Sequence, residues 1–445
     1  MSKKSISIND IHDMQESFNS RDANKIAMNA VCHGSALKVA MNRHIHSEFP
    51  MSFSTEIKSG DITNQKMSGR CWMFAGLNAL RLKAIDKMKL KTFELSQSYI
   101  MFYDKLERSN YFLENILETL NEDITSRIVM HLLAKPIEDG GQWDMFVNLV
   151  EKYGVVPKDV YPESTSSSNT NVMNSHLNEK LREFALILRS EHQKNNSIEE
   201  LRSLKSDMLQ DIYKILTIHN GVPPESFHWG YKDKNDKFHQ HNEKITPKGF
   251  FKKYIDVNLD DYVSLISCPT DDKPFNKNYT VSFLGNLVEG RKVSYLNVDI
   301  DTMKQAALKT LKNNNPVWFG CDVGKQLASD EGILDVNGFS FDLLYDTKFK
   351  MNKAQRVDYG HSLMTHAMLF TGVHEQNGKT TRWKVENSWG EEKGKKGFLV
   401  MSDAWFDEYV FQVVVLKDNL DKKLLKEFEN DPIVLKPWDP MGSLA

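Results

Sequence analysis

The sequence predicts an α+β protein with a helical front half, a back half rich in short strands, and a cleft between them. Two observations carry this prediction. Apolar residues recur at helical spacing through much of residues 61–220, and short apolar runs bounded by Gly, Asn and Asp fill the chain from about residue 260 onward. Each element must bury its apolar face against another layer, and binding sites collect between such layers.

Two amphipathic helices are expected in the middle of the chain. Apolar residues step by three or four positions over 177–188 and again over 201–215, which places them on one face of each helix. Ser197 and Glu200 form a capping box before the second helix. The Ser- and Asn-rich stretch 164–170 precedes both helices, and we expect it to be a surface loop.

The expected strands are short and lie in the back half. Their ranges are 367–371, 382–385, 397–401 and 411–416. We divide the chain into an N-terminal wrapping segment (1–60), a helical lobe (61–163), a helical insertion (164–260), a β-rich lobe (261–435) and a C-terminal arm (436–445). The insertion helices are expected to pack within the chain or against another subunit.

Length and charge limit the classes of function that the chain can have. The 445 residues suffice for a large core, and the 57 basic and 60 acidic side chains leave a net charge of −3. A dedicated nucleic-acid or anionic-membrane protein would need a basic surplus, so neither partner is expected. We find no apolar run of about 18 residues for a membrane helix and no apolar signal core after Met1.

The four cysteines argue against metal binding and against disulfides. Cys32, Cys71, Cys268 and Cys321 are far apart and match no zinc or disulfide spacing. We therefore expect neither a metal nor another cofactor. Reduced thiols together with the lack of a signal core favour a cytoplasmic protein.

Cys71 is the candidate nucleophile. Apolar residues recur at helical spacing over 73–88 and Gly69 interrupts the pattern before them, so a helix is expected to begin at or just after Cys71. The N-terminal end of a helix presents unpaired N–H groups and the positive end of its dipole. Both stabilise a thiolate, and a nearby imidazolium can lower a cysteine pKa to about 3–4.

The surroundings of Cys71 resemble the papain-like cysteine peptidases. That family carries a glutamine six residues before a Cys-Trp pair, and Gln65 precedes Cys71-Trp72 at this spacing. The resemblance implies a two-lobed papain-like fold with the nucleophile in the helical lobe. It also implies that the Gln65 amide and the backbone N–H of Cys71 form an oxyanion hole. Ser68 occupies the position at which secreted members have a disulfide cysteine.

A second motif, Asn387-Ser388-Trp389-Gly390, resembles the same family. By this resemblance, Asn387 orients a catalytic histidine on an upstream strand, and Trp389 shields their hydrogen bond. His361 and His366 both lie nearby. His366 leads directly into an apolar run, which matches the family position, whereas His361 follows Gly360 and is expected in a turn. We therefore assign His366 as the base in the β-rich lobe.

Two further features extend the resemblance to one branch of the family. The paired glycines Gly140 and Gly141 are similar to those that let a substrate backbone approach the cleft wall. Subtracting residue numbers places His366 295 positions after Cys71, whereas mature secreted members separate these residues by about 130–150. The large insertion is similar to that of bleomycin hydrolase and the bacterial aminopeptidase C group.

The C-terminal arm contains two prolines and a tryptophan, which is unusual because chain ends are commonly polar and frayed. In the branch just named, a similar arm lies in the active-site cleft. The resemblance implies that the Ala445 carboxylate binds the α-ammonium of the substrate. The activity implied is removal of N-terminal residues from peptides with a free N-terminus, with broad specificity. It also implies a homohexamer.

Two alternatives remain open from the sequence. The same catalytic residues could serve an endopeptidase in which residues 1–60 form a pro-segment. A papain-like shell without catalysis could instead bind peptides or nucleic acid as an oligomer. The unusual C-terminal arm weighs against the first, and the complete set of catalytic residues and the net charge of −3 weigh against the second.

Overall fold

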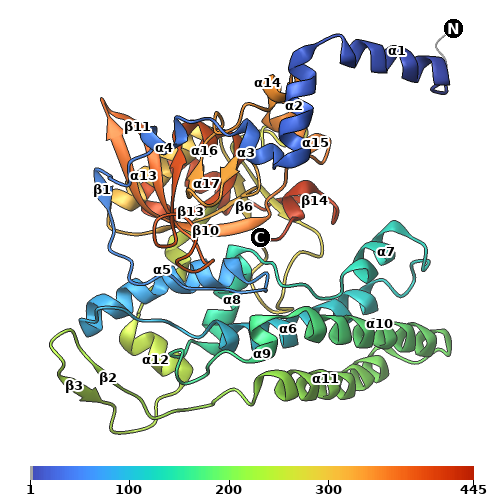
Figure 1. Ribbon diagram of the computed structural model, residues 1–445. Coiled ribbons are helices and arrows are strands. Elements are labelled where there is room, and N and C mark those ends of the chain that lie inside the picture. Colours follow the sequence, from blue (N-terminus) through green and yellow to red (C-terminus); the bar gives the residue numbers. More distant parts are fainter. Residues whose placement is uncertain (1–3) are drawn as a thin grey trace.

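A computed structural model describes residues 4–445. A mixed sheet with its covering helices forms one lobe, and a layer of long helices forms the other (Figure 1). The prediction of an α+β fold with a helical front half and a sheet-rich back half is therefore confirmed. The larger apolar cluster joins the helices to one face of the sheet, which contributes Trp318, Leu369 and Val414. A second cluster lies on the other face under α13 (Ile300–Lys312) and α16 (Asp403–Tyr409).

The helical lobe begins with the helix that carries the candidate nucleophile. Its helices are α5 (Cys71–Met88), α6 (Gln97–Glu118), α7 (Arg127–Ala134), α8 (Trp143–Tyr153), α9 (Thr165–Ser168), α10 (Asn171–Gln193), α11 (Ile198–Asn220) and α12 (Pro247–Tyr254). A small hairpin, β2 (Gly230–Lys232) with β3 (Phe238–Gln240), precedes α12. The expected start of a helix at Cys71 and both amphipathic insertion helices are confirmed.

The main sheet has twelve strands. In sequence they are β1 (Thr55–Glu56), β4 (Tyr262–Ile266), β5 (Lys277–Val281), β6 (Tyr295–Asn297), β7 (Val317–Cys321), β8 (Leu327–Ala328), β9 (Ile333–Leu334), β10 (His366–Gln376), β11 (Lys379–Glu386), β12 (Phe398–Ser402), β13 (Val410–Leu416) and β14 (Ile433–Leu435). The spatial order is β14-β5-β6-β4-β13-β7-β10-β11-β12-β9-β8, and β1 pairs with β10. All four expected strands are present.

The hairpin β10–β11 places the second motif. Asn377 and Gly378 join the strands with φ of 52° and 75°, the left-handed pair that a two-residue type I′ turn requires. This turn sets the register that runs back from Gln376 opposite Lys379 to Leu369 opposite Glu386. The start of β10 and the residue after β11 therefore lie at the same end of the hairpin.

The remaining helices cover the sheet or extend from it. They are α1 (Ile8–Asn19), α2 (Asp22–His33), α3 (Ala36–Ala40), α4 (Ile45–Glu48), α13 (Ile300–Lys312), α14 (Phe341–Tyr345), α15 (Lys353–Asp358), α16 (Asp403–Tyr409) and α17 (Lys422–Glu429). Figure 1 shows α1 and α2 projecting away from the rest of the chain, and neither contains a buried residue. In residues 4–445, no helix combines the length and apolar character that crossing a membrane requires.

The prediction of a surface loop over 164–170 is wrong. Ser164 caps the short helix α9 through a capping box with Ser167, and the side chains of Ser167 and Thr170 are buried. Ser and Asn side chains cap helices as readily as they form loops, because they bond to nearby backbone groups in both settings. Composition alone therefore did not distinguish a buried cap from an exposed loop.

Helix α5 joins the two lobes through a buried ion pair. Arg81 on α5 and Glu386 on β11 approach to 2.8 Å, and both side chains are almost fully buried. Arg81 also donates to the carbonyl oxygen of Asp61 at 2.8 Å. Burial raises the pKa of Glu386 even though Arg81 opposes the shift. The ionised form of Glu386 therefore depends on the positive charge of Arg81. Since Asn387 follows Glu386 directly, this pair also fixes the end of the strand that leads to the site.

We expect Arg81→Ala to lower the free energy of unfolding by about 3–5 kcal/mol, because it leaves a buried carboxylate without its partner. Lys180→Ala is the control: Lys180 pairs with Glu183 at the surface, and its loss should cost less than about 1 kcal/mol. Urea denaturation followed by circular dichroism measures both. Equal losses in the two variants would contradict the role of the buried pair.

Candidate active site

The thiol of Cys71 lies at the junction of the two lobes. Cys71 is the first residue of α5 and is only 2% exposed. The backbone N–H of Ala367, the second residue of β10, donates to its Sγ at 3.4 Å. The indole N–H of Trp318 on β7 donates to the carbonyl oxygen of Trp72 at 3.1 Å. The first turn of α5 is therefore fixed directly to the strand that begins with His366.

Hydrogen bonds determine the tautomer of His366. Asn387 Oδ1 lies 2.9 Å from His366 Nε2 and 2.7 Å from the backbone nitrogen of Ser388. Because the Ser388 N–H can only donate, the atom facing it must be the amide oxygen of Asn387. His366 Nε2 must then carry a hydrogen, which leaves Nδ1 of the neutral ring as the proton acceptor.

Trp389 contacts His366, whereas two other nearby histidines lie away from Asn387. The rings of Trp389 and His366 lie 4.9 Å apart between centroids, so the indole covers the imidazole. His361 is exposed in the turn after α15. His374 lies eight residues farther along β10, about 26 Å away at the ordinary rise of an extended strand. Of these three histidines, only His366 contacts Asn387.

Gln65 lies between the nucleophile and the Asn387 motif. Its Nε2 donates to the carbonyl oxygen of Ser68 at 2.6 Å, and its Oε1 accepts from the Ser388 hydroxyl at 2.6 Å. A carbonyl oxygen can only accept, so the amide orientation is determined. One of the two Nε2 hydrogens is thereby used, and the other is left for a ligand. Ser388 was not singled out from the sequence, although it lies within the Asn387 motif.

The predicted low thiol pKa is not found for Cys71 on its own. Burial raises its pKa to about 11, although N–H groups of Ala367, Trp72 and Cys71 itself favour the thiolate. Burial lowers the pKa of His366 to about 4, and its hydrogen bond to the amide oxygen of Asn387 only partly opposes this. A single ion in this site loses its hydration, and this cost outweighs the stabilisation of the thiolate by the helix N-terminus. A thiolate here requires a counter-ion.

Gly140 and Gly141 lie against the C-terminal arm. The N–H of Gly141 donates to Ala445 O at 3.1 Å, and the Ala445 N–H donates to Gly141 O at 3.3 Å. A Cβ on Gly140 would lie 2.7 Å from Ala445 O, and one on Gly141 would lie 2.4 Å from the Trp72 ring. Both positions therefore require glycine, and Gly141 pairs with Ala445 as one strand pairs with another.

Contacts along its whole length hold the arm. Lys273 pairs with Asp439 at 3.0 Å, and the Arg127 guanidinium lies 3.9 Å from the centroid of the Trp438 ring. Nearer the tip, Gln142 Nε2 donates to Ser443 O at 2.7 Å. The sequence analysis did not single out Lys273, Arg127 or Gln142. Their partners are distant in sequence, and no local pattern marks them.

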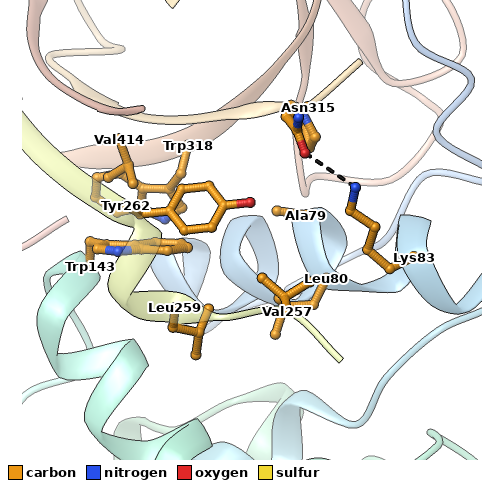
Figure 2. A pocket seen from close by; sticks show the side chains of 11 residues that line it. Ala79, Leu80, Lys83, Trp143, Val257, Leu259, Tyr262, Asn315, Trp318 and Val414 are labelled. Carbon is orange, nitrogen blue, oxygen red and sulfur yellow. Dashed lines mark hydrogen bonds between the residues drawn. The ribbon is translucent and has the colours of Figure 1, made fainter. Parts of the chain in front are cut away.

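One well-formed pocket among the described residues contains none of the predicted site residues. Figure 2 shows a pocket toward the C-terminal end of α5, walled by Trp143, Tyr262 and Trp318. Lys83 donates to Asn315 across its mouth at 3.2 Å. Residues 4–445 contain no cluster of three or more His, Cys, Asp or Glu side chains arranged to hold a metal ion.

Comparisons with known proteins agree along nearly the whole chain. A family model described as peptidase C1-like matches residues 5–442. The chain is 51% identical over 395 residues to an aminopeptidase C of Listeria innocua, covering 88% of each chain. It is 43% identical over 430 residues to a bleomycin hydrolase of Gallus gallus, covering 94% of each. A crystal structure of PepW from Lactobacillus rhamnosis superposes with a TM-score of 0.98 at 48% identity, covering both chains fully.

The pH dependence of Cys71 alkylation tests the pairing with His366. Below a thiol pKa of about 11, the thiolate fraction falls tenfold per pH unit. In His366→Ala we therefore expect alkylation of Cys71 by iodoacetamide to be at least about 100-fold slower at pH 7 than in the wild type, and to rise steeply toward pH 11. The wild type should react at pH 7, since the imidazole accepts the proton.

Mass spectrometry of the labelled peptides measures this rate. His361→Ala is the matched control and should react like the wild type, and the exposed thiol of Cys32 serves as an internal standard in every sample. A slow His361→Ala variant together with a normal His366→Ala variant would reverse the assignment.

Proposed function

The chain belongs to the peptidase C1-like family, and from this premise we propose that it is a cysteine aminopeptidase that removes residues from the free N-terminus of peptides. One observation carries the proposal: Cys71, His366 and Asn387 meet at one junction, and Ala445 lies against Gly141 beside them. The relatives named aminopeptidase C support the same activity.

The first half of the reaction forms an acyl-enzyme. The Cys71 Sγ–H proton moves to Nδ1 of His366, and the resulting ions neutralise each other in a site that disfavours either one alone. The thiolate attacks the carbonyl carbon of the first peptide bond, and the π electrons move to the oxygen. The C–N bond then breaks as His366 returns its proton to the leaving amine, which is the shortened peptide.

The second half releases the first residue. A water molecule gives a proton to Nδ1 of His366 and attacks the thioester carbon. The C–S bond breaks, the free amino acid leaves, and the proton returns to Cys71. In both halves the negative oxygen is held by the backbone N–H of Cys71 and the remaining Nε2–H of Gln65, which are fixed before the substrate arrives. Asn387 keeps the imidazole in the required tautomer throughout.

The arm supplies the preference for a free N-terminus. Leu444 and Ala445 lie against Gly140 and Gly141, and there they fill the place that residues on the N-terminal side of the first substrate residue would occupy in a longer peptide. The arm ends in the Ala445 carboxylate, which is complementary to the α-ammonium of a peptide, so a blocked N-terminus is disfavoured on both charge and space.

We further propose that subunits associate through α1 and α2, consistent with the hexamer expected from the resemblance. The inward residues of α10 and α11, such as Leu181 and Ile212, are buried within the chain. Leu186 and Ile218 on these helices are exposed, but α1 exposes three apolar residues at helical spacing, Ile11, Met14 and Phe18. An exposed apolar face on a projecting helix marks an interaction site. Another copy of the same chain is always available to bury it.

A cytoplasmic location also belongs to this proposal. All four cysteines are free, and a nucleophilic thiol persists more readily where thiols are kept reduced. The two alternatives lose support. Helices α1 and α2 project away from α5 (Figure 1), which is not where a pro-segment would block the site. The polar contacts of Cys71, His366 and Asn387 suit catalysis better than a passive binding shell.

Deleting Met441–Ala445 tests the role of the arm. The deletion retains Trp438 and Asp439, which hold the base of the arm. We expect acetylated peptides to become substrates. We also expect kcat/KM for free-amine peptides to fall roughly 10- to 100-fold, because a charge-assisted contact of about 1.5–3 kcal/mol is lost. Aminoacyl fluorophores with and without the acetyl group report both rates. Unchanged free-amine cleavage and uncleaved acetyl peptides would contradict the proposal.

Light scattering after size-exclusion chromatography tests the association. We expect the wild type near six times the chain mass of 51.3 kDa. The double variant Ile11→Lys/Met14→Lys should be smaller, because it places charge on the apolar face of α1. Glu16→Lys is the control on an exposed polar position of the same helix and should leave the mass unchanged. An unchanged mass in the double variant would move the contact away from α1.

A further inference from the structure

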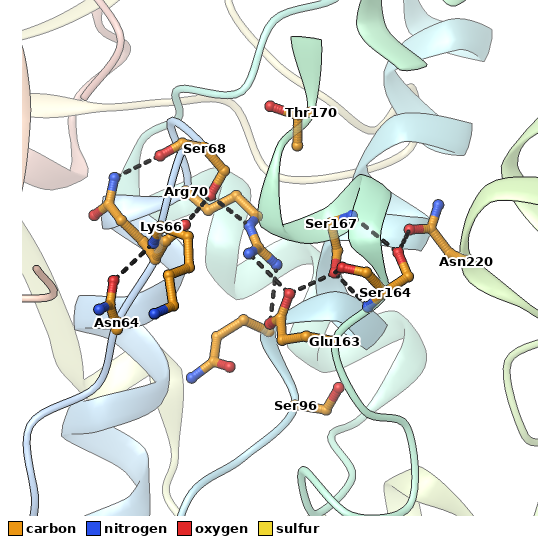
Figure 3. Close-up of polar contacts among 12 residues, drawn as sticks. Asn64, Lys66, Ser68, Arg70, Ser96, Glu163, Ser164, Ser167, Thr170 and Asn220 are labelled. Atoms are coloured by element: carbon orange, nitrogen blue, oxygen red, sulfur yellow. Dashed lines mark hydrogen bonds and ion pairs between the residues drawn. The ribbon is translucent and has the colours of Figure 1, made fainter. Parts of the chain in front are cut away.

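The start of the helical insertion contacts the loop that leads to the nucleophile. We call residues 65–70 the nucleophile loop. Its Met67 N–H donates to Ser168 O at 3.0 Å, and its Arg70 side chain reaches Glu163, just before α9 (Figure 3). Ser168 lies in the stretch 164–170 that composition assigned to the surface, and Glu163 directly precedes it. The burial of this stretch against the loop suggests a role beyond packing.

Glu163 and Arg70 form a bidentate ion pair. Arg70 Nη1 and Nη2 lie 3.2 Å and 3.0 Å from the two carboxylate oxygens of Glu163. The Ser167 hydroxyl donates to the same carboxylate at 2.5 Å. Burial by itself raises the pKa of Glu163, but the Arg70 charge and these hydrogen bonds bring it below the ordinary value. Two parallel bonds fix the angle of the guanidinium as well as its position.

The guanidinium in turn fixes Ser68. Arg70 Nε donates to Ser68 Oγ at 2.9 Å. Because Arg has only donors, the hydroxyl hydrogen of Ser68 must point elsewhere, and it donates to Gln65 O at 2.6 Å. The carbonyl of Ser68 accepts one Nε2 hydrogen of Gln65 at 2.6 Å. Ser68 therefore forms hydrogen bonds to Gln65 through both its backbone and its side chain.

A second contact ties the same loop to the insertion. The Asp139 carboxylate accepts from the Gly69 N–H at 3.0 Å and from Thr170 Oγ1 at 2.5 Å. It also pairs with the buried ammonium of Lys105 at 2.6 Å. Two carboxylates thus hold consecutive residues of the nucleophile loop. A buried ion pair adds little stability over apolar residues of the same size, but breaking one by removing a partner is costly. Each pair therefore keeps its loop residue in one position.

We propose that Glu163 is a positioning residue that orients the oxyanion donor Gln65 through Arg70 and Ser68. The proposal rests on the role of Gln65 proposed above. The polar chain occupies the place of a covalent brace, because Ser68 stands where a disulfide cysteine would stand and all four cysteines of the chain are free. Its effect falls on the step that builds negative charge on oxygen and leaves the thiol itself unchanged.

A comparison of two reactions at Cys71 isolates this effect. Hydrolysis of an aminoacyl fluorophore needs the oxyanion hole, whereas alkylation by iodoacetamide displaces iodide and forms no oxyanion. We expect Gln65→Ala to lower kcat about 100-fold and Glu163→Gln about 10-fold, each with KM changed less than about threefold. Alkylation should stay within about twofold of the wild type in both. Ser68→Ala, which keeps the ion pair, should lower kcat in the same selective way.

The double variant Glu163→Gln/Gln65→Ala decides whether Glu163 acts through Gln65. We expect it to be no slower than Gln65→Ala alone, because a residue that acts only through another adds nothing once that other is gone. Glu114→Gln is the control, since it disrupts a partly buried pair with Arg202 on α6 and α11 and should leave kcat unchanged.

Three results would overturn the inference: wild-type kcat in both Glu163→Gln and Ser68→Ala, parallel losses of hydrolysis and alkylation, or multiplying losses in the double variant. If Glu163→Gln does not fold, Ser68→Ala alone carries the test. A separate outcome reports on the proposed function itself. If Gln65→Ala keeps full activity, Gln65 is not the oxyanion donor. Glu163 then has no catalytic donor to orient.

Discussion

The burial of the first turn of α5 against β7 and β10 is the contact on which the site depends. Ala367 donates to the Cys71 thiol and Trp318 donates to Trp72 O, so the nucleophile is held by the lobe that carries its base. Arg81 and Glu386 repeat the same connection two to three turns farther along the helix. The larger apolar cluster runs through the same contact, since Cys71 and Trp72 of α5 belong to it together with Trp318 of β7.

This burial also decides the electrostatics. A free thiol and a free imidazole each become harder to ionise in the junction, and the helix N-terminus does not compensate. Near the site, the buried guanidinium groups of Arg70 and Arg81 each meet an opposite charge, on Glu163 and Glu386. An amide such as Asn387 suits this setting, because it orients the histidine without adding another buried ion.

Two segments outside the catalytic motifs reach the site. The arm pairs with Gly141. The start of the insertion contacts the nucleophile loop through Ser168 and Met67, and Asp139 links Gly69 of that loop to Thr170. In the functions proposed above, the arm limits what enters the site, and the contacts of the loop hold the oxyanion donor in place.

The sequence by itself determined the elements and the motif residues. Helical spacing placed the start of α5 at Cys71, alternating and apolar runs placed β10 to β13, and two motifs picked out Gln65, His366 and Asn387. These signals are local, since each depends on neighbours within a few residues. Only the tertiary structure decided which distant groups meet. The contacts of Gln65 with Ser388, and of Lys273 with Asp439, join segments with no shared pattern. Burial raises the pKa of the Cys71 thiol on its own, against the lowering expected from the helix N-terminus, because desolvation depends on everything packed around the thiol.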